Sequence, residues 1–315
     1  MRFLVGLFIL LFFALSAQAQ DRKSLEIVVP AGAGGGMDSV GRAAGKVLLE
    51  THMVERIEFN NISGSDGLRG VLAMRERKGK ADSLMLGSTT FVFGRLSGKV
   101  PMSQQELSPI CSLIVDYQVI AVRSGSKLKG LTDLIKSVKE KPWAYPIVGG
   151  SDPGSLDHVS IAQVLLRGGV DSVGLRWIPE DAGAAALQTF VNRNGEILSG
   201  SISEILTEHK KGNIRIVAVL SPNRLAFASE VPTAKEQGLN VEFGNWRGFF
   251  APPGISSEAA IAHERRCSEL SKNAAWKAVV PQRGWVPFVK IGSDFEKFVK
   301  SEEERLAAIL KELKI

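Results

Sequence analysis

The chain has 315 residues, of which 44% are hydrophobic and 23% are charged, and its formal net charge is +6. This length is enough for two domains with separate cores. Acidic residues stand among the lysines and arginines, as in Arg75–Lys78. The charge therefore indicates a weak attraction for anions and argues against a nucleic-acid-binding surface, which needs a basic stripe.

The N-terminus has the features of an export signal. Arg2 is followed by an apolar run from Phe3 to Leu15 and then by Ser-Ala-Gln-Ala19, which predicts cleavage after Ala19. The run is shorter than the roughly 20 residues of a membrane-spanning helix, and no cysteine follows it to carry a lipid anchor. We expect residues 1–19 to be a signal peptide and the mature protein to lie free in the periplasm.

Strand-like apolar runs alternate with helix-like periodic segments along the rest of the chain, which favours an α/β architecture with parallel sheets. Helices are expected at 37–52 and 156–167, each with one apolar face. A last helix is predicted to open with the capping box Ser293-Asp-Phe-Glu296. Strands are expected at residues 25–30, 57–60, 84–87, 117–122, 144–148, 197–199, 214–219 and 248–251.

Two glycine loops each join an expected strand to an expected helix. The first is Pro30-Ala-Gly-Ala-Gly-Gly-Gly-Met-Asp38, and the second is Gly149-Gly-Ser-Asp-Pro-Gly-Ser155. Glycine lets a ligand approach the backbone closely, and the N–H groups at a helix start carry positive partial charge. Each loop alone also suits an ordinary tight turn, but the pair predicts a clamp for a small dicarboxylate or tricarboxylate.

Polar residues in and near these loops have different expected tasks. Asp38 would repel a bound carboxylate, so we expect it to accept loop N–H groups and hold the glycines in place, as Asp157 would in the second loop. His158 could donate to a carboxylate or have a structural role, and both interpretations stay open. The hydroxyl groups that could donate to an anion are those of Ser63, Ser88, Ser151 and Ser155.

Patterns typical of enzymes and cofactor sites are missing from the sequence. The pattern G-x-G-x-x-G breaks at Met37, and Gly41–Lys46 has neither the spacing nor the hydroxyl residue of a phosphate-binding loop. Ser151 is followed by Pro153 where a hydrolase nucleophile elbow needs glycine. The histidines stand singly, without H-E-x-x-H or C-x-x-C. We therefore predict no enzymatic activity, no metal and no cofactor.

Cys111 and Cys267 are the two cysteines of the chain. An oxidising compartment would join them if they lie close together, but the sequence does not give the Cα separation that decides this. Both outcomes stay open, and we slightly favour unpaired, buried thiols.

Several motifs follow one another along the chain. They are Pro30–Asp38 with Arg42, Gly149–His158, Ile216–Ser221 with Arg224, Val231–Thr233 with Glu236 and Gly238, and Trp246–Gly254. In this order they resemble the substrate-binding proteins of tripartite tricarboxylate transporters, also called Bug-type receptors. The Gly-Gly-Ser and Asp-His pairs of the second loop resemble the citrate-type branch most. Departures at Asn61–Gly67 and Trp177–Gly183 leave the exact acid open.

The resemblance implies a type II periplasmic-binding-protein fold, in which two α/β domains joined by crossing strands surround a ligand cleft. Domain one would comprise residues 25–121 plus 246–315, and domain two residues 122–245. The protein would be a monomer that captures a small carboxylate and delivers it to integral membrane subunits. A sensory receptor or a carboxylate-processing enzyme is the alternative. The expected ligand-binding residues are Ala33, Gly34, Gly35, Gly36, Asp38, Ser63, Ser88, Gly150, Ser151, Gly154, Ser155 and His158.

Overall fold

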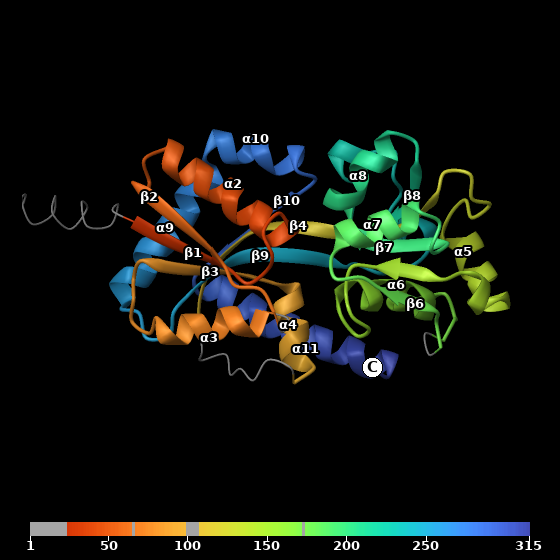
Figure 1. Ribbon diagram of the computed structural model, residues 1–315, viewed down its shortest axis with the longest axis horizontal. Helices are drawn as coiled ribbons and strands as arrows, with labels where there is room; N and C mark the ends of the chain where they lie inside the picture. Colours follow the sequence, from red (N-terminus) through yellow and green to blue (C-terminus); the bar gives the residue numbers. More distant parts are fainter. Residues whose placement is uncertain (1–23, 65–66, 99–106, 172–173) are drawn as a thin grey trace, which may run out of the picture.

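The computed structural model describes residues 24–64, 67–98, 107–171 and 174–315. The predicted signal peptide and its cleavage site after Ala19 lie outside these residues. Two α/β lobes lie end to end, with helices on both faces of a continuous sheet (Figure 1). Within the described part of the chain, no helix is long and apolar enough to cross a membrane.

The first lobe contains a mixed sheet. Strands β1, β2 and β3 run parallel to one another, whereas β9 is antiparallel to both β3 and β4. The strands are β1 (Ser24–Val29), β2 (Arg56–Asn61), β3 (Ser83–Ser88), β9 (Gly244–Ala251), β10 (Val286–Ile291) and the first part of β4 (Ser108–Arg123). The helices are α2 (Gly36–Glu50), α3 (Leu68–Glu76), α4 (Thr89–Leu96), α9 (Ser257–Lys272), α10 (Ala274–Gln282) and α11 (Ser293–Leu313).

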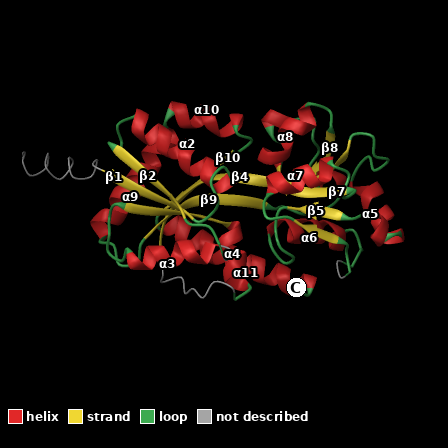
Figure 2. Cartoon of the chain, in the orientation of Figure 1, coloured by secondary structure: helices red, strands yellow, loops and turns green. Residues whose placement is uncertain are grey.

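The second lobe repeats this plan on a smaller scale (Figure 2). Strands β5, β6 and β7 are parallel, and β7 and β8 both pair in antiparallel fashion with the end of β4. The strands are β5 (Ile147–Gly149), β6 (Trp177–Pro179), β7 (Ile197–Ser201) and β8 (Ile214–Val219). The helices are α5 (Leu131–Glu140), α6 (Leu156–Arg167), α7 (Gly183–Val191) and α8 (Ile202–Lys210).

Strand β4 connects the lobes. Its residues up to Tyr117 pair with β9, and from Gln118 onward it pairs with β7. The segment before β9 crosses beside it, because Phe243 O accepts from Gln118 N at 3.0 Å and Phe243 N donates to Leu220 O at 2.8 Å. Most of β4 is buried, as its almost continuous apolar sequence requires. The fold is thus the type II binding-protein fold, with two lobes joined by crossing strands.

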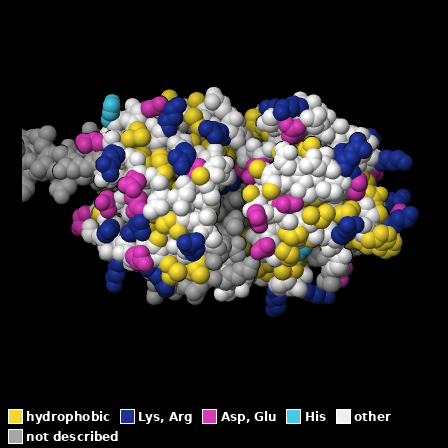
Figure 3. Space-filling view, in the orientation of Figure 1, with side chains coloured by type: hydrophobic (Ala, Val, Ile, Leu, Met, Phe, Trp, Pro, Cys, Tyr) yellow, Lys and Arg dark blue, Asp and Glu magenta, His cyan; other side chains and the backbone are white. Residues whose placement is uncertain are grey.

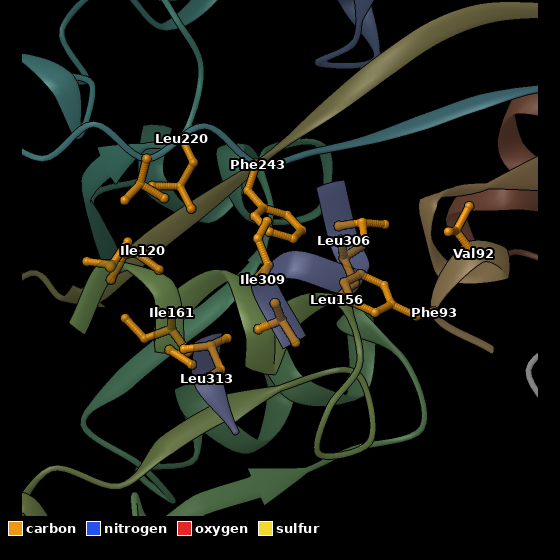
Figure 4. Close-up of a cluster of buried hydrophobic side chains, with 14 of the residues drawn as sticks. Val92, Phe93, Ile120, Leu156, Ile161, Leu220, Phe243, Leu306, Ile309 and Leu313 are labelled. Atoms are coloured by element: carbon orange, nitrogen blue, oxygen red, sulfur yellow. The ribbon is translucent and has the colours of Figure 1, made fainter. Parts of the chain in front are cut away.

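One of the three buried hydrophobic clusters that the described residues form spans both lobes. Side chains of α4, α6 and α11 pack into one cluster, in which Phe93, Leu156 and Ile309 are buried (Figure 4). Helix α11 begins under the first lobe and ends against α6 of the second, where Arg167 pairs with Glu312. The C-terminal helix therefore bridges both lobes.

Cys111 of β4 and Cys267 of α9 form a disulfide with a Cα separation of 6.5 Å. The expectation of unpaired thiols is wrong. Helix α9 packs on β4 within the first lobe, and this packing brings together two residues that are 156 positions apart.

Other expectations need smaller corrections. The predicted parallel sheets are mixed, because β4 and β9 run against their neighbours. Strands β6 and β10 were not predicted, and the strand expected at 144–148 is limited to Ile147–Gly149. The capping box at Ser293 is wrong, because Gly292 occupies the N-cap and no side chain caps α11. Helix α6 and strand β8 have the predicted bounds.

Candidate functional site

A cleft of about 630 Å³ lies between the lobes. Figure 3 shows the hollow between the two halves of the surface. Its walls are the loops that follow the carboxyl ends of the parallel strands β1, β2 and β3 on one side and β5, β6 and β7 on the other. Ligands of open α/β sheets bind at such strand ends.

Helix N-termini surround this cleft from both lobes. Among the described residues, six helices begin at it, and in none of the six does the side chain of the N-cap residue accept a helix N–H. Side chains from elsewhere accept one first-turn N–H each in α6 and α8, namely Ser151 and Asp116. Of the helices that begin elsewhere, α9 and α10 are capped by Ser256 and Asn273, whereas α5 and α11 begin at glycine N-caps without a capping side chain. Because the first N–H groups of a helix have no partner within the helix, the cleft concentrates backbone donors. The six helices start at Gly36, Leu68, Thr89, Leu156, Gly183 and Ile202.

The first glycine loop is held in shape by Asp38. Gly34 has a φ of 82°, which favours glycine, and its N–H donates to Asp38 Oδ2 at 2.9 Å. Arg42 and Asn61 also donate to the Asp38 carboxylate. Burial alone would raise the pKa of Asp38, but these hydrogen bonds together hold it below its usual value. The predicted loop-holding role of Asp38 is confirmed.

The second loop has the same local design. Gly154 also has a φ of 82°, and its N–H donates to His158 Nδ1 at 3.1 Å, again four residues along the chain. Asp157 Oδ2 accepts from Gly150 N at 2.8 Å, which confirms the predicted role of Asp157. His158 lies edge-on to Trp177 with ring centroids 5.0 Å apart, and burial lowers its pKa. The structure therefore favours the structural interpretation of His158.

The floor of the cleft carries a buried ion pair. Arg247 Nη2 lies 3.3 Å from Asp116 Oδ2, and Arg247 Nη1 donates to Gly36 O at 3.0 Å. Ser203 Oγ donates to the same carboxylate oxygen, Asp116 Oδ2, at 2.6 Å. Burial raises the pKa of Asp116, and the guanidinium of Arg247 opposes that rise. The pair links the starts of α2 and α8 across the two lobes.

Two further carboxyl groups face the cleft with raised pKa values. Burial raises the pKa of Glu204 to about 7, with a further contribution from Asp116, and the pKa of Asp157 also rises to about 7. A side chain at Gly183 would overlap the Glu204 carboxyl group. The start of α7 therefore approaches Glu204 closely because residue 183 is glycine.

Most of the expected ligand-binding residues lie together. The residues that line the cleft are Ala33, Gly34, Gly35, Gly36, Ser63, Ser88, Gly150 and Ser151. The residues that stand outside its lining are Asp38, Gly154, Ser155 and His158. Three of these four support the loops through the contacts given above, and Ser155 is the N-cap residue of α6. A ligand-binding role for each residue stays a prediction.

The comparison with protein families agrees with this geometry. Residues 60–315 match the model of the tripartite tricarboxylate transporter family receptor. The chain belongs to this family. The receptor is 24% identical over 308 residues to protein BugT of Bordetella pertussis, a match that covers 95% of this chain and 91% of that protein. A protein from a tcbD-tcbE intergenic region of a Pseudomonas strain is also 24% identical over 295 residues, covering 91% and 85% of the two chains.

Solved structures share the receptor's fold. An R. palustris protein solved with adipate superposes with a TM-score of 0.84 at 19% identity, covering 93% of this chain and 98% of that one. The periplasmic binding protein BugD gives 0.80 at 18% identity, covering 93% and 98%. MatC from Rhodopseudomonas palustris with bound malate gives 0.77 at 19% identity, covering 91% and 99%. Family members are solute-binding receptors, and these neighbours are two-domain binding proteins.

Sequence reasoning missed several residues that line the receptor's cleft. Asn245 and Arg247 are polar residues at alternate positions of a strand that is otherwise buried and apolar, which was a usable signal. Ser201 and Glu204 have the spacing of a capping box directly after β7. Among the described residues, no group of three His, Cys, Asp or Glu could hold a metal ion.

Proposed function

We propose that the mature protein is a periplasmic receptor that captures a small carboxylate between its lobes and passes it to the integral membrane subunits of a tripartite transporter. It acts as a monomer and does not change its ligand chemically. The observation that supports this most is the ring of six helix N-termini around one cleft. Backbone donors aimed at one space are suited to the oxygen atoms of an anion.

The electrostatics of the cleft fit a carboxylate held by the backbone. Arg247 is the one cationic side chain among the described lining residues, and it already pairs with Asp116. Asp157 and Glu204, with pKa values of about 7, carry reduced negative charge near neutral pH. The two glycine loops would therefore supply the attraction, with Ser151 adding a hydroxyl donor.

The proposal includes the limits of the domains and of the leader. Domain one is residues 25–121 plus 246–315, and domain two is residues 122–245. The change of β4 partners at Gln118 and the start of β9 at Gly244 support a hinge near these limits. The leader, residues 1–19, is removed after Ala19 on export, as its sequence pattern predicts.

Calorimetric titration of the mature protein with a panel of dicarboxylates and tricarboxylates tests this function. We expect at least one acid to bind with micromolar or tighter affinity, about 8 kcal/mol or more. NMR of the same mixture should recover all of the acid unchanged. Native mass spectrometry after gentle purification should show any retained acid. The receptor assignment would be rejected if none of the acids bound. It would also be rejected if the protein consumed an acid and the variant His158→Ala did not.

A further inference from the structure

Two buried polar atoms at the floor of the cleft have no partner among the residues that the structure describes. They are Ser88 Oγ and Asn245 Oδ1. Ser88 is 0% exposed and Asn245 is 7% exposed, and both residues line the cleft. Because buried polar atoms in folded proteins are nearly always hydrogen-bonded to protein or to ordered water, these two atoms are available to a water molecule or to a polar group of a bound ligand.

The two atoms belong to one face of the sheet. Ser88, the last residue of β3, stands directly opposite Arg247 of β9. Asn245 precedes Arg247 by two positions on the same strand. Side chains at alternate positions of a strand, and those directly opposite in a pair of strands, share a face. Ser88, Asn245 and Arg247 therefore form one group on the side that faces the cleft.

The chemistry of this group differs from that of the glycine loops. Asn245 Oδ1 can only accept a hydrogen bond, whereas Ser88 Oγ can both donate and accept. In this orientation of the Asn245 amide, a carboxylate oxygen would meet the lone pairs of Oδ1, and an ammonium group would approach the guanidinium of Arg247. A neutral hydroxyl group can donate to Asn245 Oδ1 and accept from the Ser88 hydroxyl at the same time.

We propose that the cleft selects carboxylates that carry a hydroxyl substituent and that Ser88 and Asn245 recognise this hydroxyl. The inference rests on the proposed carboxylate-receptor function and narrows its substrate class to hydroxy acids. An analogue without the hydroxyl leaves two buried polar atoms unpaired when it binds. This unpaired state costs binding free energy, so the analogue should bind more weakly than the hydroxy acid.

Matched acids that differ only at the hydroxyl carbon test the proposal. Calorimetry on the mature protein would compare malate with succinate, citrate with tricarballylate, and malate with aspartate. We expect the hydroxy acid of at least one pair to bind at least tenfold more tightly than its deoxy partner, and aspartate to bind more weakly than malate. Equal affinities within both pairs, or tighter binding of aspartate, would overturn the inference while leaving carboxylate binding intact. Binding of none of the five acids would reject the proposed function as well.

Variants then assign the selectivity to the two side chains. In Ser88→Ala and in Asn245→Ala, the affinity ratio between hydroxy and deoxy acid should fall at least threefold, because deoxy binding changes little. Ser112→Ala is the matched control. Ser112 is a buried serine whose Oγ accepts from Lys290 N and which does not line the cleft. An unchanged ratio in both cleft variants would contradict the assignment.

The stability of the ligand-free protein gives a second readout. Ser88 Oγ has no partner among the described residues, so Ser88→Ala should leave the melting temperature unchanged or raise it. A structural serine would behave in the opposite way, and Ser112→Ala should lower it. A clear fall in the melting temperature of Ser88→Ala would show that its hydroxyl supports the fold and would overturn its proposed role.

Discussion

Asp116 and Arg247 form an ion pair at 3.3 Å in which the two side chains are only 0% and 5% exposed. Removing one member of a buried pair leaves an uncompensated charge, which typically costs about 3–5 kcal/mol. We therefore expect Arg247→Gln to lower the free energy of unfolding by about 3 kcal/mol, measured by urea denaturation.

The double variant Asp116→Asn with Arg247→Gln is the control for this prediction. It removes both charges, so most of the lost stability should return. If the double variant were as unstable as the sum of the two single variants, the pair would not be the source of the effect.

A methyl group at Gly35 should obstruct the ligand without disturbing the fold. Gly35 has a φ of −73°, and an added Cβ would lie at an ordinary 3.4 Å from Gly32 O. We expect Gly35→Ala to weaken carboxylate binding at least tenfold, about 1.4 kcal/mol, in calorimetry. Gly125→Ala is the matched control. Gly125 lies outside the cleft, and an added Cβ there would meet nothing within 4 Å, so this variant should bind with the affinity of the parent protein.

Gly150 is a less clean test than its sequence pattern suggests. An added Cβ there would overlap the backbone of Ala182 and Gly183 at the start of α7. Gly150→Ala must therefore displace α7, so it would not separate a loss of binding from a change in the fold. Undiminished binding in Gly35→Ala would argue against close backbone approach in the first loop.

Ser151 and Ser155 belong to the same loop but differ in position. Ser151 lines the cleft, and its Oγ accepts from Asp157 N at 3.2 Å, which leaves its proton free to donate. Ser155 lies outside the lining. We expect Ser151→Ala to lose about one to two decades of affinity, since a hydrogen bond to a charged group contributes roughly 1.5 to 3 kcal/mol. Ser155→Ala should lose less than threefold, and equal losses in titrations of the two variants would contradict this placement of the ligand.

The sequence predicted the local parts of the site well because they depend on neighbouring residues. The contacts from Gly34 to Asp38 and from Gly150 to Asp157 lie within single strand-loop-helix units, so spacing and charge were enough to predict them. The bounds of α6 followed from its apolar period in the same way.

The rest of the site depends on contacts between distant segments. Arg247 meets Asp116 and Gly36 only because β9 lies between β3 and β4. The apolar runs of these strands predict that they are buried strands. They do not show in which direction each strand runs in the sheet, so the antiparallel pairing could not be predicted. The same limit applies to Cys111 and Cys267, whose pairing follows from the packing of α9 on β4.

The disulfide should support stability but not binding. It closes a loop across 156 positions, and a bond that closes a loop of this size contributes about 5 kcal/mol in the chain-entropy model. We expect the variant Cys111→Ala with Cys267→Ala to lose about that much in urea denaturation. Neither cysteine lines the cleft, so the carboxylate affinity of the double variant should match that of the parent protein. A large loss of affinity would indicate that the bond shapes the cleft.

The carboxyl groups of the cleft predict a dependence of binding on pH. Glu204 and Asp157 have pKa values raised to about 7, mainly by burial, and Glu204 also faces Asp116 and Arg247. A bound carboxylate favours their neutral forms, so binding takes up protons, and affinity should rise as the pH falls from 8 to 6. A ligand carboxyl with an ordinary pKa of about 4 stays ionised across this range.

The sign for stability follows from the same raised pKa. The folded protein holds the Glu204 proton more strongly than the unfolded chain, whose value is 4.5, so the contribution of this group is complete below pH 4.5. This contribution to the free energy of unfolding is lost as the pH rises through about 7, and above that pH it no longer changes. Glu204→Gln removes one of the two titrating groups and should bind a carboxylate more tightly than the parent protein at pH 8, with a flatter pH profile. Calorimetry at pH 6, 7 and 8 in both proteins measures this. A parent-protein affinity that fell on acidification would contradict the prediction.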